Sequence, residues 1–147
     1  LPLFDTEQGL CGRCLKQAPA FDSAWSPFIY GQPLEWMIAR LKFNANLIQA
    51  AVLADLMLQR LPVQAIKPDC IMPVPLHDQR LRQRGFNQSV ELVRPLAHAL
   101  NVRLDLNSCR RLRPTPPQTG MNAQQRRRNL RGAFDFKNDQ AAWCAAC

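Results

Sequence analysis

Apolar residues recur at intervals of three and four along the first half of the chain, which is the spacing of one face of an α-helix. This spacing begins after Pro33 and is carried by Leu34, Met37, Ile38 and Leu41. It predicts one helix that ends at the Asn44–Asn46 break and a second that runs from Leu47 to about Leu61, where Pro62 ends it.

The second half of the chain alternates between strand-like and helix-like patterns. Cys70–Val74 is a short apolar run, and apolar and polar residues alternate from Val102 toward Leu112, so both segments are predicted to be strands. Asn87 is a good N-cap for a helix that runs to Leu100, and a last short helix is predicted from Asn122 to Leu130. This order predicts an α/β architecture with a mainly parallel sheet, whose ligands bind at the carboxyl ends of the strands.

Length and composition suit one globular domain, because 147 residues with 47% hydrophobic and 20% charged side chains can bury a core. The apolar stretches are far shorter than the roughly 20 residues that a membrane helix needs, and the amino end lacks the pattern of a secretory signal. We therefore expect a cytoplasmic protein without membrane insertion. In that compartment the six cysteines are expected to be free thiols or metal ligands rather than disulfides.

The formal net charge of +8 is concentrated in one part of the chain. Between Arg80 and Arg131 there are twelve arginines and no lysine, against only Glu91 and Asp105, for a local charge of about +10. Arginine presents a planar fork that pairs with phosphate through two hydrogen bonds. The plainer alternative is a solvated basic face that has no ligand.

One segment, Ile71–Gln88, places the arginines where phosphate groups are commonly held. A predicted strand leads into an arginine-rich turn, and a helix begins directly after it, so side chains and free backbone N–H groups could meet one anion. His77 in this segment is expected to contact phosphate or to serve as a turn residue. The candidate phosphate- or pyrophosphate-binding residues are Arg80, Arg84, Gly85, Asn87 and Gln88.

Three motifs in this order closely resemble the ComF/GntX family: Pro73–Gln88, Thr115–Gly120 and Arg126–Phe134. These are phosphoribosyltransferase-like proteins linked to DNA uptake and to the use of DNA as a nutrient. The resemblance implies a type I phosphoribosyltransferase-like fold, with a mainly parallel sheet and flanking helices, that is incomplete in this chain. It assigns residues 31–136 to that partial domain, residues 1–30 to the remnant of a zinc-ribbon-like segment and residues 137–147 to an unmatched tail.

The resemblance also implies roles for two segments. The Arg80–Gln88 turn corresponds to the pyrophosphate-side loop, and Thr115–Arg131 corresponds to a flap that closes over the substrate. A proline-rich surface loop would have much the same composition as this flap. The candidate flap residues are Thr115, Gln118, Thr119, Arg127, Arg128 and Asn129.

The part of the family pattern that defines the substrate site is missing from this sequence. The family carries two adjacent acidic residues followed by Thr-Thr-Gly, a loop that holds the ribose 5-phosphate of phosphoribosyl pyrophosphate. No such combination occurs among the 147 residues. The sequence therefore assigns no catalytic residue, and Mg²⁺ is expected only in a full-length relative that binds phosphoribosyl pyrophosphate.

Cys11 and Cys14 have the spacing of a zinc knuckle, but they supply only two of the four ligands that a structural zinc site needs. In the family this pair resembles the last of several such knuckles, and the partners would precede Leu1. Cys144 and Cys147 could complete the site from the other end of the chain. Zinc binding is therefore expected to be weak.

Two functions from different classes fit these features. The first is a shortened phosphoribosyltransferase-family protein of DNA uptake and nucleoside metabolism, which is expected to be inactive as this chain and whose ligand is a phosphorylated small molecule such as phosphoribosyl pyrophosphate or pyrophosphate. The second is a zinc-containing accessory that binds single-stranded DNA or the competence machinery. Base stacking needs aromatic side chains, and Phe86 is the only aromatic residue between Arg80 and Arg131, which favours the first function.

Overall fold

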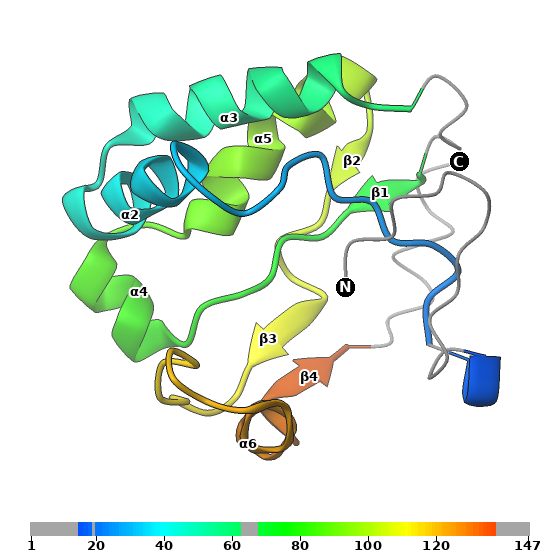
Figure 1. Ribbon diagram of the computed structural model, residues 1–147, viewed down its shortest axis with the longest axis vertical. Coiled ribbons are helices and arrows are strands. Elements are labelled where there is room, and N and C mark those ends of the chain that lie inside the picture. The colour runs from blue at the N-terminus through cyan, green and yellow to red at the C-terminus, as the bar shows by residue number, and fades with distance from the viewer. Residues whose placement is uncertain (1–14, 19, 63–67, 138–147) are drawn as a thin grey trace.

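A computed structural model describes residues 15–18, 20–62 and 68–137 as a mixed α/β structure (Figure 1). The helices with described bounds are α2 (Leu34–Asn44), α3 (Leu47–Gln59), α4 (Asp78–Arg84), α5 (Gln88–Leu100) and α6 (Ala123–Leu130). The described strands are β1 (Cys70–Ile71), β2 (Arg103–Leu104), β3 (Cys109–Arg111) and β4 (Phe134–Phe136). None of the described helices is long and apolar enough to cross a membrane.

Helices α2, α3 and α5 form a layer that contains most of the buried apolar residues (Figure 1). Ala50 and Ala54 of α3 and Ala97 of α5 are all buried, and their small side chains allow these two helices to approach closely. Leu41 brings α2 into the same core. The helices predicted from the apolar spacing are confirmed, and the break between α2 and α3 lies at Ala45, whose backbone is left-handed with φ 51°.

The predicted parallel pairing is confirmed for one pair of strands. β1 and β2 are parallel, with Cys70 opposite Arg103 and Ile71 opposite Leu104. The N–H of Asp105 continues this ladder to the carbonyl of Ile71 at 2.9 Å. The strand predicted over 70–74 is shorter than expected, because regular pairing ends at Ile71 and the chain then runs extended through two prolines.

The prediction of one strand from Val102 to Leu112 is wrong, because a turn divides it into β2 and β3. The Oδ1 atom of Asp105 accepts hydrogen bonds from the N–H groups of Asn107 and Ser108, both at 3.0 Å, and turns the backbone away from β1. β3 then pairs with β4 in a separate antiparallel sheet, with Arg110 opposite Asp135. Within the described residues the strands are therefore not mainly parallel, because β1 and β2 form a parallel pair and β3 and β4 form an antiparallel pair.

The arginine-rich segment expected to be a turn is the helix α4. His77 caps its amino end, with Nδ1 accepting from the N–H of Gln79 at 3.2 Å, and Gly85 ends it with φ 81°. Asn87 then caps α5, as predicted, by accepting from the N–H of Ser89 at 3.0 Å. Its amide also donates to the carbonyl of Val74 at 3.1 Å, which ties α5 to the chain that leaves β1.

Helix α6 begins as predicted from the sequence. Asn122 and Gln125 form a reciprocal capping box, in which each side chain accepts from the other residue's N–H, at 2.9 and 2.8 Å. The helix stands at one end of the β3–β4 sheet, and α4 lies between that sheet and the layer of α2, α3 and α5 (Figure 1). The segment between β3 and α6 lies next to the lower end of α4 in this view, where Arg80 donates to the carbonyl of Thr115 (Figure 1).

Candidate anion-binding site

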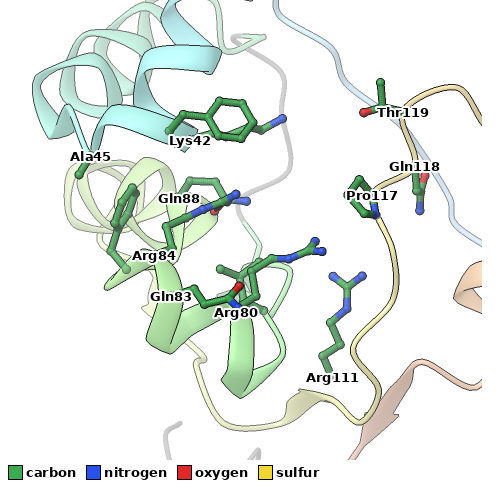
Figure 2. Close-up of a pocket in the computed structure, with 13 residues that line it drawn as sticks. Lys42, Ala45, Arg80, Gln83, Arg84, Gln88, Arg111, Pro117, Gln118 and Thr119 are labelled. Carbon is green, nitrogen blue, oxygen red and sulfur yellow. Dashed lines mark hydrogen bonds between the residues drawn. The ribbon is translucent and has the colours of Figure 1, made fainter.

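A cavity of about 670 Å³ lies between the end of α2, helix α4, the start of α5 and the segment that follows β3. Four cationic side chains line it, and no carboxylate is among its described lining residues. These cations are Lys42, Arg80, Arg84 and Arg111, and we call this space the arginine cavity. Figure 2 shows their side chains directed toward the gap between α4 and the 117–119 segment. A site of this composition favours an anionic ligand.

Helix α4 places two arginines on the cavity side because Arg80 and Arg84 are four residues apart and so lie on the same face. Arg82 lies between them in sequence, is exposed and does not line the cavity. Arg84 donates from Nη1 to Oε1 of Gln88 at 2.7 Å, which joins the last residue of α4 to the first of α5. Its guanidinium carbon also lies 5.9 Å from the centre of the Phe43 ring.

Arg111 reaches the cavity from β3, on the side opposite α4 (Figure 2). Its guanidinium carbon lies 5.2 Å from the Phe134 ring centre, and its Nη2 donates to the hydroxyl of Thr115. Arg80 donates from Nη2 to the backbone carbonyl of Thr115 at 3.1 Å. The two arginines thus converge on one residue of the segment after β3.

Two of the cavity arginines have a lowered pKa. Partial burial is the main cause that lowers the pKa of Arg84, and repulsion from Arg80 adds to it. The pKa of Arg111 is lowered by the same two causes in the same order. Both groups remain charged at neutral pH, because an arginine side chain is not deprotonated in proteins. An anion in the cavity would relieve this repulsion.

The structure brings three of the five predicted phosphate-binding residues to the cavity, Arg80, Arg84 and Gln88. Gly85 and Asn87 line a neighbouring cavity of about 690 Å³ instead. The N–H of Gly85 donates to the carbonyl of Leu81 at 2.7 Å, so it closes α4. The candidate site therefore does not receive this N–H group, and the cationic side chains that line the cavity come from α2, α4 and β3.

The predicted flap residues fall into three groups. Gln118 and Thr119 line the arginine cavity. Thr115 lines a smaller cavity of about 170 Å³ that shares Arg80 and Arg111 with it. Arg127 and Arg128 are exposed on α6 and line neither of these two cavities, whereas Asn129 donates from Nδ2 to the carbonyl of Pro116 at 3.1 Å.

The lining residues that sequence reasoning missed include Lys42, Phe43 and Arg111. Lys42 and Phe43 stand at the end of a predicted helix, and nothing in that helix indicates that it reaches the arginine-rich segment. Phe43 is 78% exposed and lies off the apolar stripe predicted for this helix, and an aromatic residue outside that stripe is a sequence signal that could have drawn attention to it. Arg111 belongs to a strand that was predicted to be half-buried. That pattern alone is only a weak signal that the Arg111 side chain lines a cavity.

The predicted zinc ligands Cys11 and Cys14 lie outside the described residues, as do Cys144 and Cys147. Among residues 15–18, 20–62 and 68–137, no three His, Cys, Asp or Glu side chains are grouped closely enough to hold a metal ion.

The chain is similar in sequence to several known proteins. It is 40% identical over 129 residues to the DNA utilization protein YhgH of Salmonella typhi, and 35% identical over 129 residues to the protein of that name from Escherichia coli K12. Both alignments cover 84% of this chain and 57% of the relative. Competence protein F of Haemophilus influenzae is 36% identical over 133 residues, covering 86% of this chain and 57% of the relative. The chain thus spans little more than half the length of these relatives. No family model matches it, and no solved structure matches it significantly.

Proposed function

We infer that this chain, which belongs to the family of competence protein F and the DNA utilization protein YhgH, binds a phosphorylated small molecule in the arginine cavity. The membership expected from the three motifs is confirmed by these relatives. We propose that the ligand is pyrophosphate or carries a pyrophosphate group, as phosphoribosyl pyrophosphate does. The observation that carries this proposal is the convergence of Arg80, Arg84 and Arg111 on one cavity that no described carboxylate lines.

The chemistry of the cavity supports a phosphate group over a carboxylate or a halide. Three guanidinium groups offer several N–H donors in planar forks, which match the oxygen atoms of a phosphate two at a time. The side-chain amides of Gln83, Gln88 and Gln118 also line the cavity and can donate to further oxygens. A diphosphate has enough acceptor oxygens to engage several of these donors at once.

The proposed fold is the phosphoribosyltransferase-like one, and the parallel β1–β2 pair, whose strands are connected through helices α4 and α5, supports it. Transfer of the phosphoribosyl group is not part of the proposal for this 147-residue chain, because its sequence has no acidic pair followed by Thr-Thr-Gly. The proposal assigns Mg²⁺ to relatives that carry that loop. It assigns weak zinc binding to Cys11 and Cys14, whose two thiolates suit half of a tetrahedral site.

Isothermal titration calorimetry of the 147-residue chain with pyrophosphate tests the proposal. We expect one binding event that disappears when Arg80, Arg84 and Arg111 are all replaced by alanine. Replacing Arg82, Arg94 and Arg110 provides the control, because it removes the same charge from exposed positions that do not line the arginine cavity. Equal losses in the two triple variants would show a diffuse basic surface and would refute the site.

Binding of single-stranded DNA is the second candidate, and one observation favours it. The arginine segment has few aromatic residues of its own, but the fold brings Phe43 from α2 to Arg84 and Phe134 from β4 to Arg111. A nucleic-acid base could stack on the exposed Phe43 ring while its phosphate contacts Arg84. The names of the relatives, which refer to DNA utilization and competence, agree with either candidate.

A further inference from the structure

Thr115 is buried in a segment whose neighbouring residues are exposed. Its side chain and backbone together are only 5% exposed, whereas Pro114, Pro116 and Pro117 are all exposed. Each proline ring fixes its own φ angle and restricts the residue before it, so the backbone around Thr115 has few alternative conformations. The sequence thus presents the two oxygen atoms of Thr115 in a nearly fixed position.

Both oxygen atoms of Thr115 accept hydrogen bonds from cavity arginines. Its carbonyl accepts from Arg80 of α4, and its hydroxyl accepts from Arg111 of β3. These two guanidinium groups repel each other, and partial burial has removed part of the water that would solvate Arg111. A partly desolvated donor without an acceptor is costly, so the Thr115 oxygens stabilise an arrangement that the two charges alone would oppose.

We propose that Thr115 is a positioning residue, whose hydroxyl holds the Arg111 guanidinium beside that of Arg80 so that both can engage one anion. This role rests on the proposed function, since it concerns the same cavity. Arg111 has further N–H donors beyond the one that Thr115 engages, and these remain for a ligand. Thr115 itself does not contact the ligand in this proposal, because it lines the smaller cavity and not the arginine cavity.

The position of Thr115 also links the cavity to α6. Asn129 of α6 donates to the carbonyl of Pro116, the residue directly after Thr115. Farther along the same segment, Gln118 and Thr119 line the arginine cavity. The segment from Thr115 to Thr119 therefore accepts hydrogen bonds from two cavity arginines at its first residue and lines the cavity at its last two. Between them, Pro116 connects it to α6.

Three variants at position 115 test the role of the hydroxyl. Thr115→Val keeps the branched shape and the backbone carbonyl but removes the acceptor for Arg111, so we expect its affinity for pyrophosphate to fall about tenfold. Thr115→Ala removes the same acceptor without adding a methyl group and carries the same expectation. Thr115→Ser restores the hydroxyl, and its affinity is expected to stay within about twofold of the parent chain. Thermal unfolding of each variant reports whether the fold is retained.

A double-mutant cycle shows whether Thr115 acts through Arg111. In the Arg111→Ala background, Thr115→Val should cause no further loss of pyrophosphate affinity, because the group that it positions is already absent. A loss that persists in that background would overturn the positioning role, and so would an unchanged affinity of Thr115→Val alone. These results differ from failure of the proposed function, in which the parent chain itself binds no pyrophosphate.

Discussion

The guanidinium group of Arg84 donates to the side-chain carbonyl of Gln88 at 2.7 Å, and this bond joins the end of α4 to the start of α5. The two helices are separated by Gly85, Phe86 and Asn87, so a contact between their ends fixes the angle at which the chain turns. The same bond holds Arg84 at the wall of the arginine cavity, where Gln88 also lies. The same side chain therefore makes a structural contact and lies where the proposed ligand would bind.

We expect Arg84→Ala to weaken the binding of pyrophosphate by about 1.5–3 kcal/mol, because a charge-assisted hydrogen bond to the ligand is lost. Arg82→Ala is the matched control, since Arg82 lies on the same helix, carries the same charge and is exposed away from the cavity. Calorimetric titration of both variants measures the difference. Similar losses would mean that net charge, rather than the position of Arg84, governs binding.

The second prediction concerns the stability of α5, which Asn87 supports in two ways. Asn87→Ala removes both the cap to Ser89 and the bond to the Val74 carbonyl, so we expect the free energy of unfolding to fall by about 1–2 kcal/mol. Asn87→Asp keeps an acceptor for the Ser89 N–H and loses only the donor to Val74. Urea denaturation should therefore place Asn87→Asp between the parent chain and Asn87→Ala. An alanine variant as stable as the parent would show that these bonds contribute nothing net.

Local signals in the sequence predicted most of the helices. They did not predict the parts of the fold that long-range contacts or turns determine. Apolar spacing and caps were sufficient for α2, α3, α5 and α6, because each element carries its own pattern. Helix α4 was not predicted, because its seven residues are mostly polar and form no apolar stripe. The division between β2 and β3 was missed because Asp105, Asn107 and Ser108 were counted within an alternating strand, although such residues favour turns.

The candidate site was predictable only where its residues lie within one of the motifs that the sequence analysis identified. Arg80, Arg84 and Gln88 come from a single motif and were named from the sequence. Lys42 and Arg111 come from α2 and β3, and only tertiary packing brings them to α4. Gly85 and Asn87 do not line the arginine cavity, and the Gly85 N–H on which their predicted role partly depended donates within α4 instead.

The third prediction is a pH dependence that arises from Asp105, which is only 9% exposed. Hydrogen bonds from the Ser108 side chain, and then from the N–H groups of Ser108 and Asn107, lower the pKa of this carboxyl, although burial opposes them. A group whose pKa is lowered by folding stabilises the fold above its unfolded pKa, and that contribution is lost as the pH falls through the folded pKa. The loss should therefore begin below the ordinary carboxyl pKa of about 3.9.

Asp105→Asn tests this pH dependence, because the amide keeps the side-chain oxygen that accepts from Asn107 and Ser108 but does not titrate. We expect the stability of the parent chain to fall more steeply than that of Asp105→Asn as the pH is lowered below about 4. Urea denaturation at a series of pH values gives both curves. Parallel curves over this range would exclude Asp105 as the responsible group.

The fourth prediction is that this chain releases no pyrophosphate from phosphoribosyl pyrophosphate, whatever nucleobase or amine is supplied with Mg²⁺. The arginine cavity can hold one anionic group, but in-line displacement also requires the ribose phosphate to be fixed in position. The sequence has no acidic pair with Thr-Thr-Gly to do so. An enzyme-coupled pyrophosphate assay measures the reaction, and any release that depends on Arg84 would contradict the prediction.

The last prediction separates the two candidate functions by the effect of salt and of one aromatic ring. If the arginine cavity serves a small phosphorylated molecule, single-stranded DNA should bind only through its phosphates, and its affinity should fade steeply as salt is raised toward about 0.15 M. Phe43→Leu should then change DNA binding no more than Phe136→Leu, which removes a half-exposed ring that does not line the cavity. Fluorescence anisotropy with a labelled oligothymidylate measures both effects. DNA binding that persists near physiological salt and weakens by about 1–3 kcal/mol in Phe43→Leu alone would instead identify a stacking site for single strands.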